Sequence, residues 1–267
     1  MQLNRTKLEN KIIVISGASS GIGKLIAIKA ANMGATVVLL ARSTEKLHEV
    51  CDMIRDSTTA NCIYYELDVS DFKQVTKVFN DLRKKVGPID ILVNNAGFGV
   101  FDSFVDARFE DIEEMFEVNV LGLMACTKEV LPSMLKRNSG HIINIASQAG
   151  KLATPKSSGY AATKHAVLGF TNSLRMELSQ TNVYVSAVNP GPIETDFFKI
   201  ADKSGNYVKN VKKYMLRPDN VAEQIVKLMI HPKRELNLPK WMNMGSVLHN
   251  LFPYISEKLI GNLLNKK

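Results

Sequence analysis

The sequence has few cysteines and no long apolar run, and each absence excludes a class of protein. Its three cysteines, Cys51, Cys62 and Cys126, are an odd number in a spacing that matches no metal-binding motif. We therefore expect reduced thiols in a cytoplasmic protein without a metal site. No apolar stretch reaches the roughly 18 residues that span a bilayer, and residues 1–10 lack the apolar core of a signal peptide.

Charge is balanced over most of the chain and strongly basic near its end. Residues 1–198 carry 21 basic and 21 acidic side chains, whereas residues 199–267 carry 13 and 5 and account for the whole net charge of +8. The basic segment shows no signature of a nucleic-acid-binding module, so we expect no nucleic-acid partner.

Apolar runs alternate with helical patterns over the first 190 residues. The runs are apolar throughout, which is typical of parallel strands buried on both faces. We expect strands at 11–16, 35–41, 63–68, 89–94, 141–146 and 184–189, and helices at 24–33, 43–54, 71–85, 112–137, 160–179 and 219–230. This predicts one α/β domain over 1–267, a doubly wound Rossmann-type fold whose central parallel sheet is flanked by helices on both faces.

A glycine-rich turn joins the first strand to the first helix. Gly17, Gly21 and Gly23 allow positive φ angles and a close approach of backbone amides to a pyrophosphate at the helix N-terminus. A tight structural turn alone would use the same glycines, but this position in a βαβ unit favours a dinucleotide site.

The end of the second strand indicates which dinucleotide binds. An acidic residue there would favour NAD, whereas this sequence has Arg42 and Ser43, which suit the additional phosphate of NADP. Arg42 as a solvated surface charge is the alternative. Asp68, followed by Val69, could contact the adenine or simply cap a helix.

A phenol and an ammonium group share one helical face further along the chain. Tyr160 and Lys164 lie one turn apart and follow Ser147, which stands just beyond an expected strand end. A cation near a phenol favours its ionised form, which a proton-transfer role at neutral pH requires. Asn94 to Gly97 follow the fourth strand, where they could line a cofactor or tie neighbouring strands together.

Together these motifs resemble the classical short-chain dehydrogenase/reductase family over residues 8–195. The resemblance rests on Gly17-x3-Gly21-x-Gly23, Asn94-Asn95-Ala96-Gly97, Asn119 in Val118-Asn119-Val120, Ser147, Tyr160-x3-Lys164 and Pro190-Gly191. It implies Tyr160 as the acid-base residue, Ser147 as the group that polarises the carbonyl, Lys164 as a ribose ligand that lowers the Tyr160 pKa, and Asn119 as the holder of a relay water. The implied cofactor-binding residues are Gly17, Ser19, Ser20, Gly21, Ile22, Gly23, Arg42, Ser43, Asp68, Val69, Asn95, Ala96, Gly97, Tyr160, Lys164, Pro190, Gly191, Ile193 and Thr195.

The expected activity is NADP(H)-dependent hydride transfer to or from a carbonyl or alcohol substrate, in the direction of reducing apolar ketones or aldehydes. An NAD-linked alcohol dehydrogenase and a non-catalytic dinucleotide-binding protein are the alternatives. The family resemblance also implies a homo-oligomer, a tetramer or dimer, paired through the helices at 112–137 and 160–179.

The last third of the chain is less regular. Residues 190–218, broken by prolines and a glycine, are expected to form a substrate lid. Residues 240–267 form an apolar and basic extension, in which Pro253 would begin a helix with an apolar stripe at Ile255, Leu259, Ile260, Leu263 and Leu264. That extension would pack on a partner subunit or the substrate pocket, or would touch anionic lipid from the cytoplasmic side together with Val247, Leu248, Leu251 and Phe252.

Overall fold

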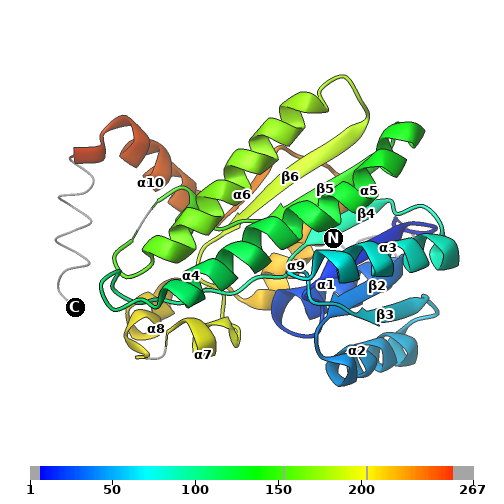
Figure 1. Ribbon diagram of the computed structural model, residues 1–267, viewed down its shortest axis with the longest axis horizontal. Coiled ribbons are helices and arrows are strands. Elements are labelled where there is room, and N and C mark those ends of the chain that lie inside the picture. Colours follow the sequence, from blue (N-terminus) through cyan, green and yellow to red (C-terminus); the bar gives the residue numbers. More distant parts are fainter. Residues whose placement is uncertain (1–6, 153, 203, 255–267) are drawn as a thin grey trace.

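The computed structural model describes residues 7–152, 154–202 and 204–254. These residues form one parallel sheet of seven strands in the order β3-β2-β1-β4-β5-β6-β7 (Figure 1). The predicted doubly wound fold is confirmed. The strands are β1 (Ile12–Ser16), β2 (Thr36–Ala41), β3 (Cys62–Glu66), β4 (Ile91–Asn94), β5 (Gly140–Ile145), β6 (Val183–Pro190) and β7 (Glu235–Leu238).

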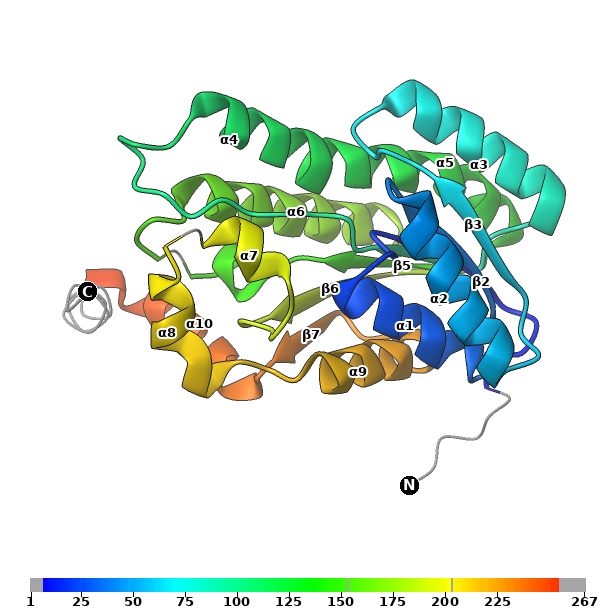
Figure 2. The ribbon, with the colours of Figure 1, turned by 90° about the horizontal axis from the view of Figure 1, so that it is seen from below.

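Helices cover both faces of this sheet, as Figure 2 shows. The long helices are α1 (Gly21–Ala31), α2 (Thr44–Ser57), α3 (Phe72–Val86), α4 (Phe109–Phe116), α5 (Leu123–Arg137), α6 (Ser158–Glu177), α9 (Pro218–Ile230) and α10 (Lys240–Leu251). The shorter elements are the π-helix η1 (Glu117–Gly122), the 3-10 helices η2 (Gln148–Gly150) and η3 (Lys212–Tyr214), and the α-helices α7 (Phe197–Ala201) and α8 (Asn206–Val211).

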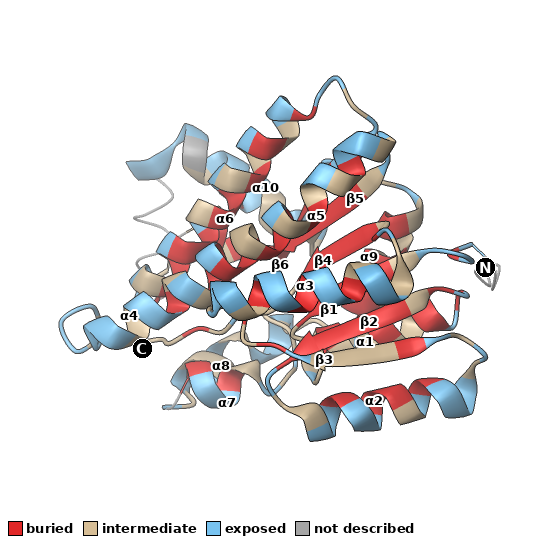
Figure 3. Cartoon of the chain, turned by 45° about the vertical axis from the view of Figure 1, so that its right-hand side comes forward, coloured by how far each residue is buried: buried red, intermediate tan, exposed pale blue. Residues whose placement is uncertain are grey.

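The central strands supply side chains to two separate cores because successive residues of a strand point to opposite faces. Ile13 and Ile15 of β1 pack with α1, α2 and α9, whereas Val14 between them packs with α3, α5 and α6. Both cores are mainly aliphatic, and the strands appear as a buried layer in Figure 3. This two-sided burial explains why the sequence of these strands is apolar throughout.

The predicted strands and helices match the structure to within a few residues, but the prediction lacked the helices α7, α8 and α10 and two further features. The sequence pattern missed β7, a four-residue edge strand whose side chains are all half-buried. It also treated 112–137 as one helix, whereas the π-turn η1 separates α4 from α5 at Glu117–Gly122. The apolar stripe expected between Ile255 and Leu264 lies outside the described residues. No helix in the described part of the chain is long and apolar enough to cross a bilayer.

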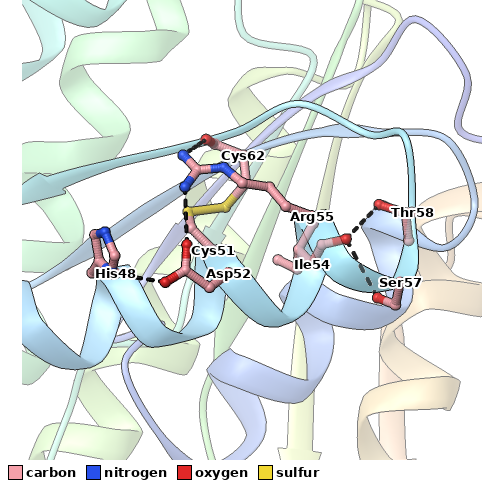
Figure 4. Close-up of a disulfide and its surroundings, with 8 residues drawn as sticks. All are labelled: His48, Cys51, Asp52, Ile54, Arg55, Ser57, Thr58 and Cys62. Carbon is pink, nitrogen blue, oxygen red and sulfur yellow. Dashed lines mark hydrogen bonds and ion pairs between the residues drawn. A yellow bond between two sulfur atoms is a disulfide. The ribbon is translucent and has the colours of Figure 1, made fainter.

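The expectation of three reduced cysteines is wrong for two of them. Cys51 of α2 and Cys62 of β3 form a disulfide, with their Cα atoms 5.5 Å apart (Figure 4). The helix packs against the strand that follows it, so two buried sulfur atoms separated by 11 positions meet in space. Neither the odd number of cysteines nor their spacing carries that information. Cys126 is a buried free thiol, and burial raises its pKa to about 12.

A buried histidine lies at the start of β5, at the opposite end of the strand from Ser147. His141 Nε2 is 2.8 Å from Ser186 Oγ, while Nδ1 has no partner among the described residues. Burial lowers the pKa of His141 to about 4, because the charged ring would lose its hydration.

We expect the free energy of unfolding to fall between pH 7 and pH 5 through His141. The unfolded imidazole, with a pKa near 6.5, takes up a proton in this range, whereas the folded one does not until about pH 4. The stabilisation is present above pH 6.5 and is lost as the pH falls, by about 2 kcal/mol at pH 5. Urea unfolding of wild type and His141→Gln at both pH values measures it. Equal losses in the two proteins would contradict the assignment.

Candidate active site

The glycine-rich loop lies at the carboxyl end of β1, beside the point where the strand order reverses between β1 and β4. Gly17 and Gly21 adopt φ angles of +64° and +53°, which disfavour other residues. A Cβ atom at Gly17 would lie 2.8 Å from the Ala96 Cα atom, and one at Gly23 would collide with the Gly17 carbonyl oxygen. The loop is therefore packed too closely for side chains at these two glycines.

Ser16 and Asn95 join the loops that follow β1 and β4. The Ser16 Oγ atom accepts hydrogen bonds from the backbone N–H groups of Asn95 and Ala96, each at 3.0 Å. The Asn95 side-chain amide donates to the carbonyl oxygens of Ser16 and Gly17, also at 3.0 Å. Asn94 instead contacts the neighbouring strand β5, where its side-chain amide donates to Asn144 Oδ1 at 2.8 Å. These asparagines therefore tie neighbouring strands together, one of the two roles that their position allowed.

The first turn of α1 has the chemistry of an anion site. Ser20, the N-cap residue, is extended and makes no side-chain capping hydrogen bond. The first backbone N–H groups of the helix are therefore not bonded to the capping side chain. Ser20 is exposed, and Ser19 and Ile22 beside it are half-buried. A Cβ atom at Gly21 would lie 3.8 Å from Thr195 Cγ2. Thr195, 174 positions away in sequence, thus borders the glycine-rich loop.

Arg42 is exposed at the end of β2 and makes no ion pair or hydrogen bond with its side chain in the part of the chain that the structure describes. Its guanidinium is thus available to a phosphate beside the loop after β1. Ser43 caps α2, accepting from Lys46 N at 3.4 Å.

Asp68 stabilises a turn and does not cap a helix. Its Oδ1 atom accepts from Ser70 N at 3.0 Å and from Ser70 Oγ at 2.6 Å. The cap of α3 is instead Asp71, so the helix-cap interpretation of Asp68 is wrong. Val69 is buried beneath η1, where a Cβ atom at Gly122 would approach its carbonyl oxygen to 2.8 Å.

Ser147, Tyr160 and Lys164 come together at the carboxyl end of β5. Ser147 follows the strand and caps η2 by accepting from Ala149 N at 3.0 Å. The Lys164 ammonium donates to the Ile145 carbonyl oxygen at 2.9 Å and lies 5.7 Å from the centre of the Tyr160 ring. Ser147 and Lys164 are thus each held by a hydrogen bond to the backbone, and the Tyr160 ring lies beside Lys164.

Burial governs the pKa values of the phenol and the ammonium group. Burial lowers the pKa of Lys164 to about 8. It raises the pKa of Tyr160 above its usual range, while a hydrogen bond with Ser147 acts in the opposite direction. The sequence implied a lowered Tyr160 pKa, but in this structure loss of solvent outweighs the favourable contacts.

Asn119 lies in the π-turn η1, a type of distortion that is frequent at functional sites. Its Oδ1 atom accepts from Phe98 N at 3.0 Å, and its Nδ2 atom donates to Phe98 O at 2.8 Å and to Thr163 Oγ1 at 3.2 Å. Thr163 in turn donates to the Tyr160 carbonyl oxygen at 2.8 Å. Only glycine fits at Gly97, where a Cβ atom would lie 2.8 Å from Asn119 Oδ1.

Four aromatic rings cluster next to the phenol of Tyr160. The Phe101 ring centre is 5.6 Å from that of Tyr160, and the Phe197 ring centre is 5.8 Å from it. Phe198 and Tyr207 extend the cluster through edge and stacking contacts with Phe101 and with each other. The rings come from the loop after β4 and from α7 and α8, which lie within the segment predicted as a lid.

The remaining predicted residues lie where β6 ends. Pro190 is the last residue of that strand, and the next amide, Gly191 N, donates to Leu238 O of β7 at 2.6 Å. Ile193 pairs with Leu216 in an isolated parallel bridge. The segment therefore leaves the sheet and passes beside the glycine-rich loop before it enters α7.

Two contributions were missed at the sequence level. Thr163, fully buried between Asn119 and Tyr160, carries no signal of its own, because it lies in the middle of the Tyr-x3-Lys spacing. The pairing of Phe101 with Phe197 joins positions 96 residues apart, which no local pattern reveals. The adjacent aromatic residues Phe197 and Phe198, in an otherwise polar segment, were the available clue.

Comparison with known proteins gives a consistent picture. The short chain dehydrogenase family profile matches residues 11–204. The NADP-dependent 3-hydroxy acid dehydrogenase of Schizosaccharomyces pombe is 36% identical over 228 residues, which cover 83% of this chain and 87% of the relative.

Solved structures agree with this match. An alcohol dehydrogenase from Thermococcus sibiricus, complexed with 5-hydroxy-NADP, has a TM-score of 0.77 and 29% identity and covers 85% of this chain and 95% of its own. A short chain dehydrogenase/reductase from Burkholderia phymatum, in complex with NAD, has a TM-score of 0.85 and 25% identity over 92% and 94% of the two chains. With its motifs, its fold and these relatives in agreement, the chain belongs to the short chain dehydrogenase/reductase family of oxidoreductases.

Proposed function

We propose that this protein is an NADP(H)-dependent oxidoreductase that interconverts apolar ketones or aldehydes and their alcohols. The observation that carries the proposal is the convergence of Ser147, Tyr160 and Lys164 beside the glycine-rich loop, on the side of the sheet where such folds bind ligands. The crowded Gly17 and Gly23, the uncapped start of α1 and the unpaired Arg42 fit a dinucleotide phosphate.

The residues divide the chemistry between them. Bound NADPH supplies a hydride, which adds to the carbonyl carbon. The Ser147 hydroxyl orients the carbonyl oxygen, and Tyr160 donates its phenolic proton to that oxygen to complete the alcohol. Lys164, with a pKa of about 8, is mostly protonated at neutral pH and stabilises the phenolate that remains. Asn119 holds the backbone around Phe98 and Thr163, next to the position proposed for a relay water.

The aromatic cluster supports an apolar substrate. Phe101 and Phe197 contact the Tyr160 ring directly, so a substrate carbonyl that reaches Tyr160 must displace or slide between these rings. Because α7 and α8 carry three of the four rings next to Tyr160, we assign segment 190–218 as the lid that moves when substrate enters. A site walled by phenyl rings favours a ligand that is itself apolar next to its carbonyl group.

Replacing Tyr160 tests the catalytic assignment. Wild-type protein should oxidise NADPH with at least one apolar ketone or aldehyde in an absorbance screen of aldehydes, ketones, quinones and sterols. Tyr160→Phe removes only the proton donor, so turnover should fall by a factor of about 100 or more while NADPH affinity, measured by fluorescence titration, stays within a few-fold. Lys164→Met should impair both turnover and NADPH binding. Turnover like wild type in the Phe variant would refute the mechanism.

NADP is proposed over NAD because of Arg42. The family includes chains solved with either cofactor, so the family alone does not decide the choice. The Arg42 guanidinium is exposed and has no partner among the described residues, and β2 does not end in a carboxylate. Both features favour the cofactor with the additional phosphate. An NAD-linked alcohol dehydrogenase is the competing assignment.

Arg42→Ala should raise the KM for NADPH by about ten- to a hundredfold, since it removes a charge-assisted contact worth roughly 1.5–3 kcal/mol. The KM for NADH, which lacks that phosphate, should change little. Steady-state kinetics with both cofactors measures the two effects. If wild type uses NADH and NADPH equally well, the NADP assignment fails.

We also propose that the protein is a homo-oligomer paired through the long helices α5 and α6. Ala162, Gly169 and Ser173 are exposed along one side of α6, and a Cβ atom at Gly169 would meet nothing within 4 Å. Small side chains of this kind permit another helix to approach closely.

The cytoplasmic location expected from the sequence stays a prediction, because a Cys51–Cys62 disulfide is more typical of oxidising compartments.

Gly169→Leu should lower the mass measured by light scattering at micromolar concentration, because the larger side chain would separate the paired helices. Lys77→Leu on α3 adds the same side chain at an exposed site elsewhere and serves as the control. A wild-type monomer at that concentration would contradict the proposal.

A further inference from the structure

Helix α10 carries the most apolar exposed face in the described part of the chain. In Figures 1 and 2 it projects from the same end of the molecule as α7 and α8. Half or more of the surface is exposed in each of six large apolar side chains: Trp241, Met244, Val247, Leu248, Leu251 and Phe252. A helix that served only to complete the core would turn such residues inward.

These side chains share one side of the helix. At roughly 100° per residue they fall within an arc of about 140°, in which Lys240 is the only charged position. The opposite side holds α10 on the domain. Met242 Sδ lies 2.7 Å from where a Cβ atom of Gly191 would be, Asn243 Oδ1 accepts from Lys151 Nζ at 3.0 Å, and Ser246 is buried. The outward face is thus presented by a helix that is anchored through its other side.

Positive charge borders this apolar face. The Tyr214 ring of η3 contacts the Trp241 ring with centres 5.9 Å apart, so η3 lies next to the start of α10. Lys212 and Lys213 of η3 are exposed, as is Lys240 beside Trp241. Neither these lysines nor Lys209 of α8 pairs with a carboxylate in the described ranges.

We propose that the outward face of α10, with the lysines beside it, docks on an anionic phospholipid surface. Exposed Trp, Phe and Leu on one side of a helix, next to lysines, match the requirements of the headgroup boundary. A second copy of the chain is the other apolar occupant to consider. Pairing this face with itself would bring the unpaired lysines of two copies together, and the cores of protein interfaces are depleted of lysine.

The position of the face gives the docking a consequence that rests on the proposed function. Lys151, which holds Asn243 of α10, follows η2 and thus lies four residues beyond Ser147. Docking through α10 would therefore place the substrate end of the domain against the bilayer, where lipophilic carbonyl compounds accumulate.

Co-sedimentation of the full-length protein with vesicles tests the docking. At 50 mM salt the protein should sediment with phosphatidylcholine vesicles that contain 30% phosphatidylglycerol, but not with pure phosphatidylcholine, and 500 mM salt should weaken binding. Lys212→Ala with Lys213→Ala should weaken binding about thirtyfold, from about 1 kcal/mol for each lysine near an anionic surface. Met244→Ser with Leu248→Ser should weaken it at least as much. Activity towards a water-soluble aldehyde should be unchanged in both double variants.

Matched controls on α3, at the other end of the molecule, separate a local site from general charge and apolarity. Lys73→Ala with Lys77→Ala, and Phe72→Ser alone, alter exposed residues of the same kinds and should bind vesicles like wild type. Equal weakening by the control and α10 variants, or no vesicle binding by wild type, overturns the proposal. So does a drop in oligomer mass for Met244→Ser with Leu248→Ser, which would show that a second copy covers the face. None of these outcomes depends on whether the predicted reductase activity is found.

Discussion

The hydrogen bonds of Ser16 and Asn95 are the interaction on which the site depends most. They join the ends of β1 and β4 at the one place where the sheet reverses its order, and they hold the glycine-rich loop against the loop that begins at Asn95. Each bond satisfies a backbone group that would otherwise be left unpaired as the strands end. Because the strands are parallel, fixing this edge also fixes where Arg42, Ser147 and Thr195 lie around it.

A second set of polar contacts extends from this edge into the helical layer. Asn94 and Asn144 connect β4 to β5, and Asn144 donates to Thr171 of α6 at 2.9 Å. Asn119 makes the equivalent connection one layer further out, from the π-turn to Thr163. Buried amides that donate hydrogen bonds between elements favour a single arrangement of those elements, whereas apolar packing alone tolerates small shifts. The spacing of Tyr160 and Lys164 from β5 is therefore set by polar contacts as much as by the core.

Tyr160, the proposed acid-base residue, lies between these polar contacts and the aromatic cluster. Phe101 and Phe197 remove water from the phenol, which raises its pKa and keeps it protonated at neutral pH. A protonated phenol is the form that the proposed reduction would consume. In that proposal the same rings would separate to admit a substrate, so one group of side chains would form both the apolar wall of the site and the lid.

The sequence by itself determined the order of strands and helices, because apolar runs buried on both faces and glycines at strand ends are local features. It also determined the glycine-rich loop, Arg42 and the Ser147, Tyr160 and Lys164 set, since each stands at a strand end or one helical turn from its neighbour. Tertiary structure alone decided the rest. The Cys51–Cys62 disulfide, the bridging role of Thr163, the short edge strand β7 and the rings over Tyr160 depend on which elements pack together. Such contacts join positions whose separation along the chain obeys no period, so they arise only when the sheet brings its carboxyl ends and helices into one place.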